Sequence, residues 1–103
     1  MAKAKLLYKE KLVLRSGLLR DGVIWKVPKN AHYPDGVRYR LALVEVISGK
    51  IIALFDNHHP KGHHLHLEDG TERSYRFESV GKLVDDYLRM ISQEEEKREG
   101  QKN

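Results

Sequence analysis

The stretch Val37-Arg38-Tyr39-Arg40-Leu41-Ala42-Leu43-Val44 alternates apolar side chains with charged or small ones. This period of two predicts a β-strand with one buried face, and it puts Arg38 and Arg40 on the opposite face. The strand is expected to span 37–47 and to end at the turn Ser48-Gly49-Lys50. A second apolar run, 51–55, follows at once, so residues 37–55 are predicted to form a β-hairpin.

Four further strands and one helix are expected around this hairpin. An apolar run interrupted by charges predicts an edge strand over 5–14, and alternation predicts strands over 23–27, 63–67 and 72–77. Asp69-Gly70 is a strong signal for a tight turn between the last two. Ser79 can cap a helix in which apolar residues recur every three or four positions up to Ile91. The sequence therefore predicts an α+β fold, a curved antiparallel β-meander of about six strands with one C-terminal amphipathic helix packed on one face.

The same alternation assigns side chains to the two faces of the sheet. We expect the helix at 79–91 to cover the apolar face, with Trp25 and Tyr39 in the core and the indole not serving as a platform for stacking bases. The apolar face is predicted to consist of Trp25, Leu41, Leu43, Phe55, Leu65 and Phe77. The opposite face is predicted to carry Lys26, Arg38, Arg40, His64 and His66.

Length and composition limit the kinds of protein to consider. The 103 residues suit a single domain, 1–91, followed by a charged segment, 92–103, that either extends the helix or frays. The absence of cysteine excludes disulfides and thiolate chemistry, so any metal would be held by nitrogen and oxygen. The apolar runs are too short to cross a membrane and no signal peptide is visible, so a cytoplasmic protein is expected. The net charge of +4 favours polyanionic partners.

Histidines gather in one short segment of the chain. Five of the six fall between His58 and His66, together with Asp56, Asn57 and Lys61. A histidine can transfer a proton, bind a phosphate or coordinate a metal at physiological pH. On the strand 63–67, His64 and His66 would point the same way, roughly 7 Å apart. This density of histidine indicates a chemical role for the segment.

The first hypothesis is a metal-independent endoribonuclease that needs no cofactor. Cleavage of RNA through its own 2′-hydroxyl requires a base, an acid and a cation beside the phosphate. We assign His64 and His66 as the acid and base, Lys61 as the cation and Asp56 as the carboxylate that orients a histidine. Further contacts to the nucleic acid are expected from Lys26, Arg38, Arg40, Asn57, His63 and Arg76.

Two alternatives remain open from the residues alone. In a metal-binding nuclease or hydrolase, His64 and His66 would be ligands together with Asp56, His58 or His63, although Lys61 would repel a cation. In a non-enzymatic module, the basic face would bind nucleic acid or an acidic protein. Asp56 and Asn57 also have a purely structural interpretation, as caps of the turn that ends the strand 51–55.

Several motifs together resemble one family. They are Trp25-Lys26-Val27-Pro28, Arg38-Tyr39-Arg40-Leu41, Asp56-Asn57, Lys61-Gly62-His63-His64-Leu65-His66, and Tyr75-Arg76-Phe77 ahead of a helix. In this order they resemble the TumE-like toxins of bacterial and archaeal toxin–antitoxin pairs, over nearly the whole domain. The resemblance implies a toxin that acts on RNA and a cognate antitoxin partner with a helix-turn-helix DNA-binding region. A homodimer is compatible with the sequence.

Overall fold

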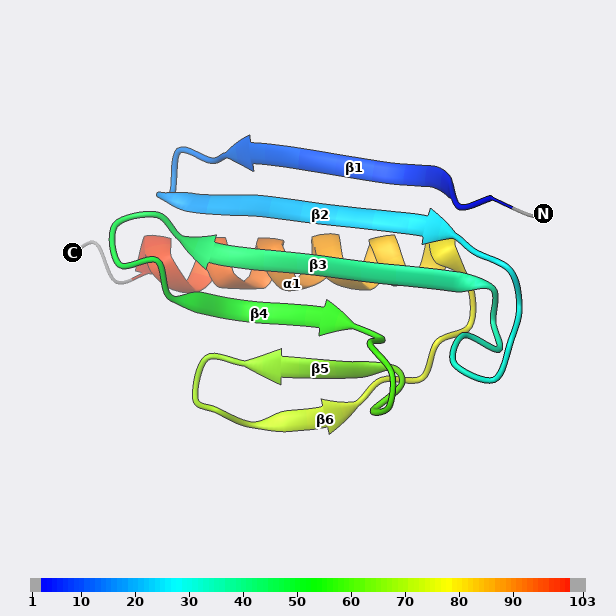
Figure 1. Cartoon of the computed structure of the whole chain (residues 1–103). Coiled ribbons are helices and arrows are strands. Elements are labelled where there is room, and N and C mark those ends of the chain that lie inside the picture. Colours follow the sequence, from blue (N-terminus) through cyan, green and yellow to red (C-terminus); the bar gives the residue numbers. More distant parts are fainter. Residues whose placement is uncertain (1–2, 101–103) are drawn as a thin grey trace.

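The computed structural model describes residues 3–100, which form six strands and one helix (Figure 1). The strands are β1 (Lys5–Val13), β2 (Leu18–Lys26), β3 (Val37–Glu45), β4 (Ile51–Asp56), β5 (His64–Leu67) and β6 (Glu72–Ser74). They lie side by side in chain order, and each pairs with the next in antiparallel fashion. The predicted antiparallel meander with one C-terminal helix is therefore confirmed.

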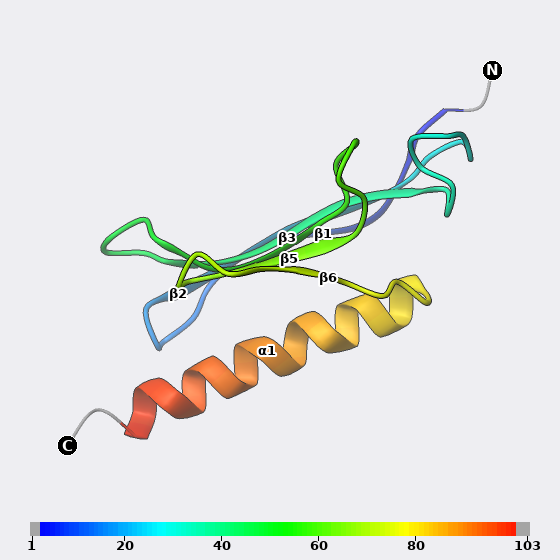
Figure 2. The ribbon, with the colours of Figure 1, turned by 90° about the horizontal axis from the view of Figure 1, so that it is seen from below.

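The helix α1 (Val80–Gly100) runs along one face of the sheet and leaves the other face uncovered (Figure 2). It begins where the Ser79 hydroxyl accepts a hydrogen bond from the Lys82 N–H at 3.1 Å, which is the predicted cap. It continues past Ile91 through the charged segment as far as Gly100, and residues 101–103 lie outside the described part of the chain. Within residues 3–100, no helix is both long enough and apolar enough to cross a membrane.

The hydrophobic core lies between α1 and the sheet face that it covers. Leu83, Tyr87 and Ile91 are the buried residues of the helix, at the predicted spacing of four. The Tyr87 hydroxyl also donates a hydrogen bond of 2.7 Å to the Ala42 carbonyl, which ties the helix to the middle of the sheet. The helix packs on buried sheet residues that include Leu18, Ile24, Tyr39, Leu41, Leu43, Ala53 and Phe55.

The structure reverses the predicted orientation of β2, so the predicted places of Trp25 and Lys26 were wrong. Trp25 lies opposite Arg38 in the register of β2 and β3, whereas Ile24, which is 0 % exposed, lies opposite Tyr39. Directly opposed residues share a face, so the indole is half-buried on the uncovered face and Lys26 is on the helix side. The prediction failed because apolar residues occupy positions 23, 24, 25 and 27, which fit either orientation of the strand.

β2 also begins earlier than predicted, at Leu18 instead of residue 23. Arg20, Asp21 and Gly22 hid this half of the strand, because they interrupt its apolar alternation. At Gly22 the missing side chain is required by packing, since a Cβ there would lie 2.7 Å from the buried Leu41 Cδ2. Because β2 begins at Leu18, its pairing with β1 and β3 is longer than the sequence predicted.

Besides the Ser79 cap, a side-chain contact of Tyr75 fastens the segment after β6 to the helix. The Tyr75 hydroxyl donates a hydrogen bond of 2.6 Å to Asp86 Oδ2, and Lys82 Nζ lies 2.9 Å from Asp86 Oδ1. Burial by itself would raise the pKa of Asp86, but the hydrogen bonds from Tyr75 and Lys82 outweigh it and lower that pKa. The carboxylate form is therefore favoured by folding, and it stabilises the native state above the ordinary pKa of aspartate.

We predict that Asp86→Asn lowers the free energy of unfolding by about 1–2 kcal/mol at neutral pH, because it removes a charged acceptor. The difference should shrink as pH falls below about 4, the ordinary pKa of aspartate, because the unfolded chain then binds the proton first. It should vanish once the native carboxylate is protonated, below its lowered pKa. Denaturant unfolding at several pH values measures both effects. The exposed neighbour Asp85 provides the control: Asp85→Asn should change little at any pH. A difference for Asp86→Asn that does not depend on pH would contradict this account.

Candidate functional site

The end of β4 sends two consecutive polar side chains to opposite faces of the sheet. Asp56 lies opposite Arg40 of β3 and His64 of β5, on the face that the helix leaves uncovered. Asn57, the next residue, points into the protein and is 3 % exposed. This change of direction follows from the period of two in an extended chain. The Asp56 carboxylate therefore lies at the candidate site, whereas the Asn57 amide lies in the interior and holds the strands together.

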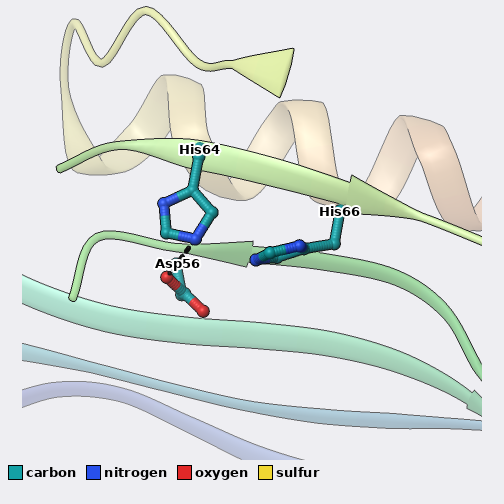
Figure 3. A group of neighbouring side chains, drawn as sticks. All are labelled: Asp56, His64 and His66. Atoms are coloured by element: carbon teal, nitrogen blue, oxygen red, sulfur yellow. Dashed lines mark ion pairs between the residues drawn. The ribbon is translucent and has the colours of Figure 1, made fainter. Parts of the chain in front are cut away.

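Asp56, His64 and His66 form a cluster on the uncovered face (Figure 3). Asp56 Oδ1 lies 2.9 Å from His64 Nε2, and both side chains are close to fully buried. The His64 and His66 rings are nearly perpendicular, with centroids 4.5 Å apart. The ring centroids are therefore closer than the roughly 7 Å between alternate residues of a strand, so the two rings lean toward each other. Their cross-strand partners in β4 are Asp56 for His64 and Leu54 for His66.

Both ring nitrogens of His64 have partners in the described structure. Nδ1 lies 2.6 Å from the Gly62 carbonyl oxygen, and because a carbonyl can only accept, Nδ1 must carry a proton. Nε2 then faces the Asp56 carboxylate. Two acceptors in direct contact would repel, so either a proton or a cation must lie between Nε2 and the carboxylate oxygen. The geometry therefore fits a hydrogen-bonded ion pair or a metal site.

Lys61 is engaged in an ion pair that the sequence did not suggest. Its Nζ lies 2.8 Å and 3.1 Å from the two carboxylate oxygens of Glu72, the residue opposite His66 in β6. The hydrogen bond from Lys61 lowers the pKa of Glu72, and the positive charges of Lys61 and the two histidines act in the same direction. His66 Nδ1 is 4.0 Å from the same carboxylate and its side chain is 34 % exposed. Of the cluster's two rings, His66 is therefore the one that solvent reaches.

A shallow hollow of about 270 Å³ adjoins the cluster. Its lining includes Trp25, Arg38, Arg40 and His58. Arg38 and His58 are exposed, whereas Trp25 and Arg40 are half-buried. The aromatic ring and the two guanidinium groups are thus available on the same face as Asp56, His64 and His66. Trp25 with two arginines is a combination that suits a base and its flanking phosphates.

Three other residues assigned to nucleic-acid contacts lie away from this cluster. His63 Nδ1 is 2.8 Å from the Tyr39 hydroxyl, and its Nε2 is 2.7 Å from Asp35 Oδ2. Its ring stacks on Phe77 with centroids 4.8 Å apart, so it belongs to the edge of the core. Lys26 is on the helix side. Arg76 is exposed in the segment between β6 and α1.

The amide of Asn57 is also placed differently from the prediction, because it is used within the sheet. Its Oδ1 accepts a 2.9 Å hydrogen bond from the Tyr39 N–H, and its Nδ2 donates a 2.8 Å bond to the Val37 carbonyl. The side chain thus takes over the pairing with β3 just beyond the last residue of β4. Asn57 therefore has a structural role, but it bridges to β3 and does not cap the turn as predicted.

The cluster also has the composition of a cation site. Asp56, His64 and His66 each offer one ligand atom, and these atoms all lie within 4.8 Å of one another. Nitrogen and oxygen donors of this kind suit zinc, nickel or manganese. The bond from His64 Nδ1 to the Gly62 carbonyl is the outer contact that orients a metal-binding histidine. His58 and His63 are not part of this group. His58 Nδ1 approaches Asp56 to 3.8 Å but its side chain is exposed, and both ring nitrogens of His63 have other partners.

Two residues of the site were missed in the sequence. Glu72 could have been found, because the Asp69-Gly70 turn fixes which residues of β5 and β6 face each other, and it brings Glu72 opposite His66. Trp25 could not, since its face depends on the pairing of β2 with β3. Both misses concern cross-strand neighbours, which the sequence does not display directly.

These features define a small α+β domain with a histidine–carboxylate cluster on the uncovered face of its sheet. The family model of the toxin TumE matches residues 3–95 of the chain. The chain therefore belongs to the TumE toxin family, and it is a toxin of a toxin–antitoxin system with a cognate antitoxin as its partner. No curated protein and no solved structure matches the chain.

We predict that Asn57→Asp lowers the free energy of unfolding by about 2 kcal/mol or more, because a carboxylate oxygen would face the Val37 carbonyl in the interior. Denaturant unfolding measures this loss. Asn30→Asp is the matched control. Asn30 is exposed, and aspartate preserves the bonds that its side-chain oxygen accepts from the His32 and Tyr33 N–H groups. Only the exposed 3.3 Å bond from Nδ2 to the Pro28 carbonyl is lost, so the effect should stay within about 0.5 kcal/mol. Equal effects of the two variants would contradict the structural role of Asn57.

Proposed function

We propose that this toxin is an endoribonuclease whose reacting groups lie on the uncovered face of the sheet. The observation that carries the proposal is the cluster of Asp56, His64 and His66 beside two arginines and one half-buried aromatic ring. A nuclease needs proton-transfer groups next to cations that attract phosphate. A binding site for RNA on this face also explains why the helix leaves it uncovered. The activity would then take place in the cytoplasm, and the antitoxin would carry the helix-turn-helix region that the family resemblance implies.

The two histidines differ in their surroundings, which suggests different roles. His66 is the more exposed ring and is only weakly engaged by Glu72, so we assign it as the base that takes the proton of the 2′-hydroxyl. That oxygen then bonds to phosphorus and the bond from phosphorus to the 5′-oxygen breaks. His64 is assigned as the acid that protonates the departing oxygen. Because its Nδ1 faces the Gly62 carbonyl and its Nε2 faces Asp56 at 2.9 Å, the Nε2 proton reaches that oxygen only after His64 turns away from Asp56. Asp56 positions His64 and is not itself a reacting group.

The cation beside the phosphate is assigned to Arg40 in this proposal. Arg40 is the direct cross-strand neighbour of Asp56, and with Arg38 it lines the adjoining hollow. Lys61 lies close by, but its Nζ donates hydrogen bonds to both carboxylate oxygens of Glu72. It can therefore contact a phosphate only if it leaves Glu72. Trp25 is assigned to base stacking, which is worth about 1–3 kcal/mol per base in single-strand binding proteins. The recognition would be tolerant of sequence, because every base has a stacking face.

We predict that His66→Ala lowers the rate of RNA cleavage by the purified toxin about 10²–10⁴-fold, the usual contribution of a proton-transfer group. Products should carry 2′,3′-cyclic phosphate and 5′-hydroxyl ends, which end-labelling and mass spectrometry identify. His59→Ala is the control, because His59 is an exposed histidine of the loop between β4 and β5 and stacks on His32. A toxin that binds RNA without cutting it, or a His66→Ala toxin that cuts normally, would refute the assignment.

A metal-dependent hydrolase is the second candidate, favoured by the three ligand atoms within 4.8 Å of one another. Elemental analysis of untagged protein distinguishes the two. Under the main proposal, cleavage should persist after chelation and dialysis. Near-stoichiometric zinc, nickel or manganese, lost in both Asp56→Ala and His64→Ala and accompanied by loss of cleavage on chelation, would favour the second candidate.

A further inference from the structure

A second surface, on the opposite side of the sheet from the histidines, has the features of a protein-binding groove. It lies at the end of the sheet where β1 begins, β2 ends and β3 and α1 begin (Figure 1), and its volume is about 690 Å³. Four lysines line it: Lys3, Lys5, Lys26 and Lys29. All four are exposed, and in residues 3–100 none of them forms an ion pair.

The side chains between these lysines are apolar. Leu7 of β1, Val37 of β3 and Val27, the residue after β2, line the groove, and Val80 lines it from the first turn of the helix. Leu7 is 42 % exposed, so apolar surface remains in contact with solvent. The acidic group of the lining, Asp35, is already bound to His63. An apolar floor formed by these side chains, in a groove that four like charges also line, is unfavourable for an isolated molecule and suits a ligand that covers both.

We propose that this groove binds an acidic segment of the antitoxin, one whose apolar side chains enter the floor and whose carboxylates pair with the lysines. Charge complementarity identifies the chemistry of the segment. Nucleic acid fits less well, because none of the side chains that line the groove in residues 3–100 is aromatic and the apolar floor offers nothing for a phosphate or a base. The groove adjoins β1, the outer strand of the sheet, so an extended segment can also pair with its free edge.

This inference does not depend on RNA cleavage. The groove and the histidine cluster lie on opposite faces of the sheet, and binding can be measured with the His66→Ala protein. The two proposals therefore fail separately: loss of antitoxin affinity by groove variants says nothing about catalysis, and an inactive His66→Ala toxin retains its groove.

The test uses the full-length toxin and the protein product of the gene next to its own. Calorimetric titration at low and moderate salt should show at least tenfold weaker binding for the double variant Lys26→Glu and Lys29→Glu, with reduced salt dependence. Lys50→Glu with Lys97→Glu is the control. It makes the same change of net charge at a second hollow of the surface, lined by both residues, and should bind within twofold of the parent.

A third variant examines the apolar floor. Leu7→Ser should weaken binding about fivefold or more without altering the melting temperature, because this side chain is partly exposed and lies outside the buried core. Unchanged affinity of the Lys26 and Lys29 double variant would overturn the proposal. So would an equal loss in the control pair, no binding of the unaltered toxin to the neighbouring gene product, or a loss confined to RNA binding.

Discussion

The structure depends on the opposite directions of Asp56 and Asn57 at the end of β4. Asn57 completes the pairing with β3 through its amide, which makes bonds to the Tyr39 N–H and the Val37 carbonyl. Asp56 thereby faces away from the helix and meets His64 at 2.9 Å. A shift of register by one residue would exchange the two side chains, bury the carboxylate in the core and break up the cluster. The interior bonds of Asn57 oppose such a shift, so the geometry of the site depends on a residue that takes no part in its chemistry.

A sheet of six strands covered by one helix has two faces with different physical properties. The helix buries Tyr39, Leu41, Leu43 and Phe55 on its side, and this burial supplies the main driving force for folding. The other face needs no apolar covering over its polar residues, and it can hold arginines, histidines and a half-buried indole. The cost of removing Asp56 and His64 from water is offset there by their mutual contact and by the Gly62 carbonyl. The residues that stabilise the fold thus lie on the face covered by the helix, and the polar residues available for chemistry lie on the uncovered face.

The neighbouring loops complete the site through cross-strand contacts. Lys61 is neutralised by Glu72, and Glu72 in turn approaches His66. On the other side of the sheet, His63 links Tyr39 to Asp35. The consecutive residues His63 and His64 therefore lie in different surroundings: His63 is beside the core, and His64 is in the cluster. In a segment so rich in histidine, the residue type alone cannot distinguish these roles, because the direction of each ring depends on its strand position and on its partners.

Sequence alone determined the elements whose patterns are local. The alternation in β3, the Asp69-Gly70 turn, the Ser79 cap and the spacing of Leu83, Tyr87 and Ile91 depend on neighbouring residues. The order of these elements predicted the α+β meander, and the shared face of His64 and His66 followed from their spacing of two. Only the tertiary structure decided the face of Trp25 and Lys26, the pairing of Lys61 with Glu72 and the inward amide of Asn57. These features depend on register between strands, and a strand with apolar residues on both faces is compatible with either orientation until its neighbours select one.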